Sequence, residues 1–283
     1  MSRIFLAGAS GVIGRRLMPL LRAAGHSVSG MTRSPDKAGL LREMGAEPVI
    51  VDVFDAEALV KAVLDAKPDM VIHQLTDLAD IRDPAKRAEA LARNARIHEE
   101  GTRNLVAAAR RAGARRLIAQ SAAWVYAPSV KPYGEDHALD TDGAQGVTAR
   151  GVASLERQVL ETPPIEGLVL RYGLLYGPGS GADAPRPAPT VHVDAAAYAA
   201  LRAVDHGGAR AYNIADPSSE VSTEKATAEL GWRADFRIEA KRGDCRAAPP
   251  LSFPPARPLS LGERAGVRAP AIDSHVLRRY AQN

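Results

Sequence analysis

The sequence predicts an α/β fold: a doubly wound parallel sheet covered by helices on both faces. Short apolar runs alternate with helical stretches through the first half of the chain. Strands and helices that alternate in this way imply right-handed crossovers and a parallel sheet. A glycine-rich turn also joins the first apolar run to the first helical stretch, at residues 8–14. Hydrophobic residues at 46% and charged residues at 25% are typical of a globular protein.

Each element follows from its local pattern. Strands are predicted at the short apolar runs 3–7, 27–32, 48–53, 69–75, 116–120, 168–170 and 211–215. Helices are predicted where apolar residues recur at helical spacing, over 11–24, from Pro35, and over 55–66, 84–113, 147–161, 191–204 and 223–230. Pro35 stands where the first turn of a helix tolerates proline, and Gly113 is a typical helix stop. The Gly-, Pro- and Ala-rich stretch 177–189 is predicted to be a loop.

Composition and charge exclude several classes of protein. No apolar run reaches the ~20 residues that cross a bilayer, and the N-terminal run is too short for a secretory signal, so we expect a cytoplasmic protein without a membrane partner. The net charge is +4, but residues 241–283 carry +5 and residues 1–240 carry −1. We expect no nucleic-acid partner, because such proteins carry positive charge on the folded body. Cys245 is the single cysteine, and no histidine has a second ligand at metal spacing, so no metal site is predicted.

The turn at residues 8–14 is the most informative segment. It follows a strand and opens a helix, which is the context that distinguishes a dinucleotide-binding loop from an ordinary turn. The first glycine permits a tight turn, the second lets backbone N–H groups approach a pyrophosphate, and the third lets the helix pack closely on the sheet. The predicted cofactor-binding residues of this loop are Gly8, Ser10, Gly11, Val12, Ile13 and Gly14.

With its Gly-x-x-Gly-x-x-Gly spacing, the chain resembles the extended or atypical short-chain dehydrogenases/reductases, the family of nucleotide-sugar epimerases and dehydratases. The segments Gly-Thr-Arg-Asn-Leu at 101–105 and Leu-Arg-Tyr-Gly-Leu-Leu-Tyr-Gly-Pro-Gly at 170–179 also match, and the likeness covers roughly residues 3–240. The resemblance implies a Rossmann-type fold and a bound nicotinamide dinucleotide. It also implies a small-molecule substrate, either a nucleotide sugar or another carbonyl or hydroxyl compound. A homodimer is left open.

The end of the second strand bears on the choice of nicotinamide cofactor. An NAD site needs an acidic side chain there, but residues 31–34 read Met-Thr-Arg-Ser and the next carboxylate is Asp36. Arg33 suits a 2′-phosphate and Ser34 adds a hydroxyl donor, so we predict NADP(H), with NAD as the alternative. The competing interpretation is a solvated arginine on a surface loop. By the resemblance, Asp52 and Val53 would lie against the adenine and Leu75 near the ribose.

The catalytic residues that the resemblance implies are incomplete. The family uses a Ser or Thr after the fifth strand and a Tyr-x-x-x-Lys on the next helix, where the lysine lowers the pKa of the proton-transferring tyrosine. Aligned on Tyr126, the hydroxyl position falls on Ala122, one residue after Ser121. Aligned on Glu156, the tyrosine and lysine positions fall on Thr148 and Val152. No tyrosine of the chain has a lysine four residues later.

Three hydroxyls near the expected substrate cleft are therefore predicted as replacement catalytic groups: Ser121, Tyr126 and Tyr133. His137 is a further candidate proton donor in the same loop. The alternative is a polar surface loop with packed aromatic rings. His73 and His192 are predicted to be structural.

These observations divide the chain into three parts: a Rossmann domain at 1–175, a small substrate-side subdomain at 176–240, and a Pro- and Arg-rich tail at 241–283 that is expected to pack poorly. The leading hypothesis is an atypical NADP(H)-binding oxidoreductase that lacks the usual dyad. An epimerase or dehydratase would need the same tyrosine. The alternative hypothesis, from a different functional class, is a non-catalytic module that senses the redox state of the cofactor or docks a partner.

Overall fold

The computed structural model describes residues 1–238, of which residues 1–237 form one compact unit. Its core is a seven-stranded sheet in which every pair of neighbouring strands is parallel. From one edge to the other, the strands are β3 (Glu47–Ile50), β2 (Ser27–Thr32), β1 (Arg3–Ala7), β4 (Met70–His73), β5 (Arg116–Ala122), β6 (Glu166–Tyr172) and β9 (Ala211–Ile214). The doubly wound parallel sheet predicted from the sequence is confirmed.

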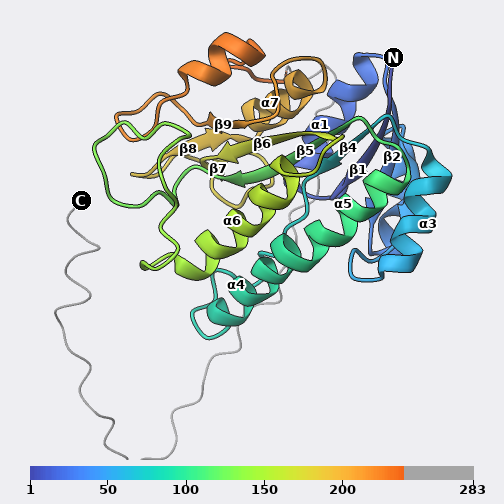
Figure 1. The fold of residues 1–283 in the computed structure, drawn as a ribbon, viewed down its shortest axis with the longest axis horizontal. Coiled ribbons are helices and arrows are strands. Elements are labelled where there is room, and N and C mark those ends of the chain that lie inside the picture. The colour runs from blue at the N-terminus through green and yellow to red at the C-terminus, as the bar shows by residue number, and fades with distance from the viewer. Residues whose placement is uncertain (239–283) are drawn as a thin grey trace, which may run out of the picture. The chain divides into compact units, whose positions relative to one another are not determined.

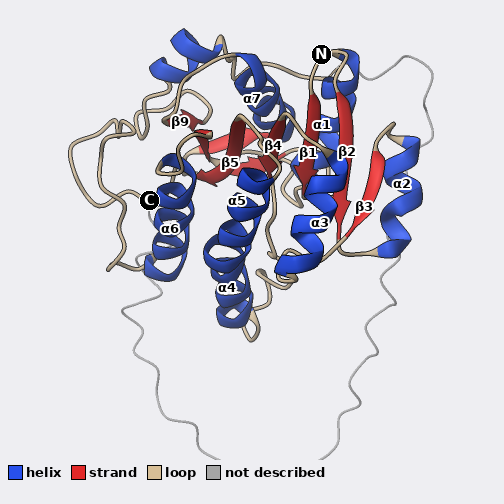
Figure 2. Ribbon diagram, turned by 45° about the vertical axis from the view of Figure 1, so that its right-hand side comes forward, coloured by secondary structure: helices blue, strands red, loops and turns tan. Residues whose placement is uncertain are grey.

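Helices cover both faces of this sheet (Figures 1 and 2). One face carries α1 (Val12–Ala23), α2 (Ala38–Glu43) and α7 (Val193–Asp205). The other carries α3 (Ala56–Ala66), α4 (Arg87–Arg96), α5 (Thr102–Arg111) and α6 (Gly146–Leu160). Each face has its own apolar core, because successive side chains of a strand point to opposite sides. Strands β1 and β4 therefore read as nearly continuous buried runs, as central parallel strands do.

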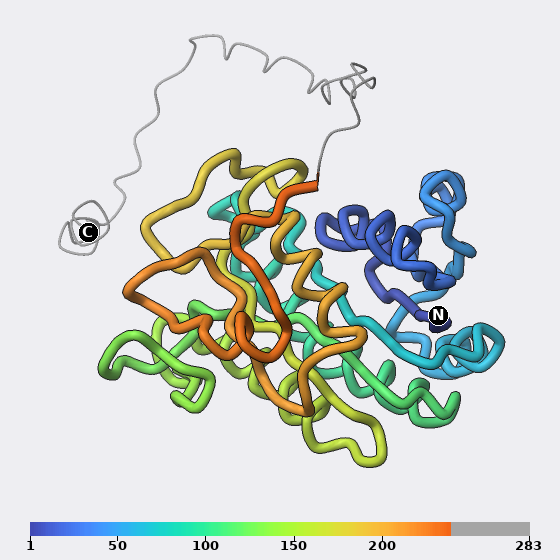
Figure 3. Tube along the Cα trace, turned by 90° about the horizontal axis from the view of Figure 1, so that it is seen from above, coloured from blue at the N-terminus to red at the C-terminus, as the bar shows by residue number. Residues whose placement is uncertain are grey.

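Helices α1 and α7 lie side by side on their face of the sheet (Figure 3). Most of the residues that α7 buries are alanines, whose small side chains permit close packing of the two helices. The indole N–H of Trp232, a fully buried side chain, donates a hydrogen bond to the carbonyl of Ala195 at 2.9 Å. The chain that follows β9 is thereby joined to the same core as α1.

Several element boundaries differ from the sequence prediction. The long helix expected over 84–113 is divided into α4, a π-helical turn at Ile97–Gly101, and α5. The strand expected over 48–53 ends at Ile50, and the helix expected from 191 begins at Val193. Two short strands, β7 (Leu174–Tyr176) and β8 (Thr190–His192), form a separate parallel pair that the sequence did not predict. Gly173 makes this pair possible, because a Cβ there would lie 2.6 Å from the carbonyl carbon of Thr190.

The segment after residue 176 contributes β9 to the main sheet and α7 to one of its faces. The part of the predicted substrate-side subdomain that extends to Arg237 shares the core of the compact unit. That residues 176–240 lie on the substrate side of the site stays a prediction. The tail predicted at 241–283 lies outside the described residues. In the described part of the chain, no helix combines the length and apolar character needed to cross a membrane.

Candidate functional site

The glycine loop has the geometry of an anion cradle. Gly8 has φ +88°, and a Cβ there would lie 2.5 Å from the backbone oxygen of Gln74 on the neighbouring strand end. A Cβ at Gly14 would overlap the carbonyl oxygen of Gly8. Both positions therefore need glycine. Gly11 caps α1 without any side-chain hydrogen bond, so the N–H groups of the first helical turn are free to bind a pyrophosphate.

The other predicted residues of the loop divide into two groups. Ser10 is half-buried, and its hydroxyl lies 3.3 Å from the hydroxyl of Thr32 at the end of β2. Val12 is also half-buried at the first position of α1. Ile13 is 4% exposed and belongs to the apolar core, so its side chain holds the helix on the sheet. The loop thus combines a backbone that a ligand can reach with a buried Ile13 side chain that fixes it to the core. This arrangement suits a bound dinucleotide.

The expected adenosine end of the site contains an ion pair. Arg33 is 61% exposed, and its guanidinium lies 3.2 Å from the carboxylate of Asp77, which is only 10% exposed. Arg93 of α4 lies 3.7 Å from the same carboxylate. The backbone N–H of Ser34 donates to the hydroxyl of Thr32 at 3.2 Å. Arg33 is therefore an accessible cation that already has one acidic neighbour.

Three more predicted contacts lie at the ends of β3 and β4. Asp52 is exposed, and its carboxylate accepts the N–H of Phe54 at 3.0 Å. Val53 is 5% exposed, and its carbonyl accepts from Asn104 at 3.0 Å. The backbone of Leu75 is fixed on both sides, because its carbonyl accepts from Gln120 at 2.8 Å and its N–H donates to His73 at 3.2 Å. Their contact with a cofactor stays a prediction.

Ser121 belongs to a buried polar network. Its hydroxyl donates to one carboxylate oxygen of Glu156 at 2.6 Å. Both oxygens of this carboxylate accept from Arg171 of β6, at 2.8 and 2.7 Å. Burial lowers the pKa of Arg171, but the hydrogen bonds and charge of Glu156 more than offset this effect and raise the pKa overall. Glu156 and Arg171 thus form a charged pair that holds the Ser121 hydroxyl against α6.

Tyr126 completes the same network. Its phenol donates to Asn213 at 2.6 Å and accepts from Arg171 at 2.9 Å. Burial raises the pKa of the Tyr126 phenol, and the charge of Arg171 opposes that effect only in part. The ring of Tyr133 stacks on that of Tyr126 with centroids 5.2 Å apart. The structure therefore links the hydroxyls of Ser121 and Tyr126 through Glu156 and Arg171, whereas Tyr133 joins them through its ring alone. Their catalytic role stays a prediction.

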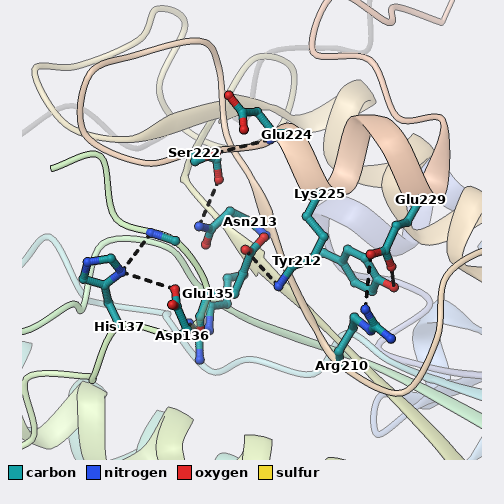
Figure 4. Close-up of polar contacts among 12 residues, drawn as sticks. Glu135, Asp136, His137, Arg210, Tyr212, Asn213, Ser222, Glu224, Lys225 and Glu229 are labelled. Carbon is teal, nitrogen blue, oxygen red and sulfur yellow. Dashed lines mark hydrogen bonds and ion pairs between the residues drawn. The ribbon is translucent and has the colours of Figure 1, made fainter.

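The loop that carries these tyrosines is fastened to β9 and to the segment after it (Figure 4). The carboxylate of Glu135, 7% exposed, accepts the backbone N–H of Asn213 at 2.7 Å and pairs with Lys225 at 3.1 Å. His137 accepts the N–H of Gly134 at 3.1 Å. The polar residues after Tyr133 thus hold the loop in place.

The helix positions that match the family's tyrosine and lysine are both buried. Thr148 is 9% exposed and Val152 is fully buried. Val152 packs in a small apolar cluster that includes Ala122 and Val125. Among the described residues, no group of three or more His, Cys, Asp or Glu side chains is placed to hold a metal ion.

Three buried polar side chains near the strand ends were not predicted as site residues. His73 accepts from the Leu75 N–H at Nδ1, so its Nε2 carries the proton and donates to Thr102 at 3.0 Å. His98, in the π-helical turn, has no partner for either ring nitrogen within the described residues, and Gln74 has none for its amide oxygen. Burial lowers the pKa of His73 to about 3 and that of His98 to about 4, so both rings are neutral at pH 7. Nothing in the helical periodicity of 84–113 signals the π-helical turn that positions His98.

The strand order β3-β2-β1-β4-β5-β6 with a glycine loop after β1 defines a Rossmann-type dinucleotide-binding protein. Residues 4–202 match the model of the NAD dependent epimerase/dehydratase family. The chain belongs to that family, and it is an NAD(P)-binding protein of the oxidoreductase and epimerase type.

A Streptomyces 3-diazoavenalumate denitrifying reductase is 36% identical, over 90% of this chain and 97% of the relative. A Streptomyces griseus dTDP-4-dehydrorhamnose reductase is 33% identical, over 62% of this chain and 51% of that protein. Among solved structures, the UDP-glucose 4-epimerase of Thermotoga maritima with UDP-glucose has a TM-score of 0.66 at 19% identity, covering 83% of this chain and 94% of the epimerase. The Thermus thermophilus UDP-glucose 4-epimerase in complex with NAD has a TM-score of 0.65 at 19% identity, covering 83% and 95%. These two structures share the fold.

Proposed function

We propose that the chain is an NADP(H)-dependent reductase that replaces the diazo group of an organic diazo acid by hydrogen. The observation that carries this proposal is the apolar cluster around Val152, with Thr148 at the position of the proton-donating tyrosine. A ketone reductase or an epimerase must move a proton on and off an oxygen, and this helix offers neither a phenol nor an ammonium for that work. The relative that matches along nearly its whole length is named for a denitrifying reduction.

The proposed reaction needs no proton donor. A bound dihydronicotinamide supplies hydride. In the substrate, the diazonium form of the diazo acid, hydride adds to the carbon that carries the N₂⁺ group and forms the new C–H bond. The carbon–nitrogen bond then breaks, dinitrogen leaves, and the hydrogen stays on carbon. One hydride and one diazonium thus give one C–H bond and one N₂, so charge and atoms balance. The protein's tasks are to bind both reactants, to align them and to exclude water.

The described residues suit these tasks. The glycine loop and the first turn of α1 bind the pyrophosphate. The apolar surface of Ala122, Val125 and Val152 excludes water from the strand ends where the nicotinamide would lie. Arg33 is the residue proposed to bind the 2′-phosphate of NADP(H).

The cofactor half of the proposal is tested with Arg33→Asp. The wild type is expected to bind NADPH more tightly than NADH, and the variant to lose that preference at least tenfold, because a charge-assisted contact contributes roughly 1.5–3 kcal/mol. Titration calorimetry with both cofactors measures the ratio of the two dissociation constants. Arg42→Asp, at an exposed position of α2, makes the same charge change and should leave the ratio as it is. A ratio in Arg33→Asp that equals the wild-type ratio would rule out the assignment of Arg33.

The reaction half is tested by following NADPH oxidation with three substrate classes: diazo acids, ketones and nucleotide sugars. We expect turnover with the diazo acids and none with the other two classes. A protein that binds NADPH but oxidises it with none of the three would instead be the cofactor-sensing module, the second function that the missing dyad favours.

A further inference from the structure

We infer that Asp77 sets the cofactor selectivity of this site, by competing with the 2′-phosphate of NADP(H) for Arg33. This inference rests on the proposed NADP(H)-dependent function. Asp77 lies in the loop after β4, whereas the acidic residue that selects NAD in this fold ordinarily stands at the end of β2. No pattern around position 77 marks that residue as a partner of Arg33. Their proximity exists only in the folded chain.

The ion pair between Arg33 and Asp77 bridges two separated strands. Arg33 follows β2 directly, and Asp77 stands four residues after β4. Strand β1 lies between them in the sheet, and the glycine loop leaves from the end of β1. The loop from β4 must therefore pass the end of β1 to bring Asp77 to within 3.2 Å of Arg33. The carboxylate thus lies on the adenosine side of the site.

Asp77 is held in this place by contacts other than Arg33. Its backbone N–H donates to the side chain of Asn94 at 3.0 Å, and Arg93 lies 3.7 Å from its carboxylate. Further along the same loop, Arg82 donates to the carbonyl of Gly181. With only 10% of its side chain exposed, Asp77 is fixed, whereas Arg33 is 61% exposed and has room to turn toward a ligand.

These positions give the two residues opposite preferences. A 2′-phosphate that binds Arg33 must take its place beside the fixed carboxylate, and like charges at that range repel strongly where water is partly excluded. A ribose with a free 2′-hydroxyl brings no charge and donates a hydrogen bond to a carboxylate. Arg33 therefore favours NADP(H), and Asp77 acts against it. The selectivity of the wild type is the balance of the two.

The test is titration calorimetry of NADPH and NADH with Asp77→Asn, a change that removes the charge and keeps the size. We expect the ratio of the NADH to the NADPH dissociation constant to rise at least tenfold. Asp80→Asn is the matched control, because Asp80 also lies near Arg93, at 3.5 Å, and its φ of +62° is one that asparagine tolerates. In Asp80→Asn, the ratio of the NADH to the NADPH dissociation constant should stay within twofold of the wild-type ratio. A ratio in Asp77→Asn that is unchanged, or that moves toward NADH, overturns the inference.

Two further variants separate the causes of failure. Asp77→Glu keeps the charge and should keep the wild-type ratio, so it shows whether an effect of Asp77→Asn comes from charge or from altered folding. Arg33→Ala tests the proposed function independently. If Arg33→Ala lowers the ratio while Asp77→Asn leaves it unchanged, the inference is wrong and the NADP(H) proposal stands. If neither change alters the ratio, the inference about Asp77 and the NADP(H) proposal are both wrong.

Discussion

Arg171 links two of the candidate catalytic hydroxyls, that of Tyr126 directly and that of Ser121 through Glu156. It donates to both oxygens of Glu156, to the phenol of Tyr126 and to the carbonyl of Glu135 at 2.9 Å. The sequence indicated Ser121 and Tyr126 through their place after the fifth strand, but their partners come from α6, β6 and β9. Contacts between segments so far apart in sequence follow from the sheet order, and no local pattern encodes them.

The role of the Tyr126 phenol is tested with Tyr126→Phe. The change removes a donor from Asn213 and an acceptor from Arg171, both of which remain buried. We expect the free energy of unfolding to fall by about 1–3 kcal/mol, the usual cost of unpaired buried polar groups, and kcat to change by less than threefold. Urea unfolding and steady-state kinetics measure the two quantities. Tyr133→Phe is the control, since its hydroxyl accepts a long hydrogen bond, 3.4 Å, from the backbone N–H of Ser129. If kcat falls ~100-fold instead, Tyr126 is the proton donor.

The segment 84–113 illustrates what can be predicted at the scale of an element. Its apolar spacing and its stop at Gly113 predicted one long helix, and helical structure is present over most of it. The π-helical turn at Ile97–Gly101 was not predicted, because an extra residue in one turn leaves composition and apolar spacing almost unaltered. A turn of this kind redirects a side chain. Here it places His98 against Gly151, where a Cβ would lie 3.4 Å from the Nδ1 atom of His98.

The buried histidines predict an acid-sensitive fold. Burial lowers the pKa of His98 to about 4 and of His73 to about 3, while an unfolded imidazole titrates near 6.5. Below pH 6.5 the unfolded state therefore binds more protons, and stability falls as the pH falls toward the folded values. His98 alone is expected to reduce the free energy of unfolding by roughly 2–3 kcal/mol between pH 6.5 and 4.5.

Urea unfolding of His98→Asn at these two pH values measures that contribution. The variant should lose less stability on acidification than the wild type does. His206→Asn, which changes an exposed histidine, should behave as the wild type. If His98→Asn and the wild type lose the same stability, the buried His98 ring is not the source of the acid sensitivity.

At the scale of the whole molecule, the fold could be predicted much further than the site. All seven strands of the sheet and the glycine loop are visible in the sequence, because short apolar runs and glycine spacing are local signals. The pairing of β7 with β8 and the ion pair between Arg33 and Asp77 depend on contacts between distant segments. The candidate site is made largely of such contacts, so the sequence indicated some of its residues and few of their partners.

The compact unit through Arg237 predicts the effect of removing the tail. It contains the complete main sheet, the glycine loop and the cores on both faces. Truncation after Ala240 is therefore expected to leave the NADPH dissociation constant unchanged and to shift the melting temperature by only a few degrees. Calorimetry and a thermal melt measure these two effects. Aggregation of the truncated protein, or loss of cofactor binding, would show that residues beyond 240 belong to the fold.

The central claim is that this Rossmann-type chain reduces a diazo acid by hydride transfer without a tyrosine–lysine pair. The most direct measurement uses NADPH deuterated at C4, supplied in separate preparations of the two stereoisomers, with a diazo acid and the full-length protein. Mass spectrometry then locates the deuterium. The account predicts one deuterium, from one of the two stereoisomers, on the carbon that carried the diazo group, together with one N₂ released for each NADPH oxidised. A product without deuterium from either stereoisomer, or NADPH oxidation no faster than with heat-inactivated protein, would contradict it.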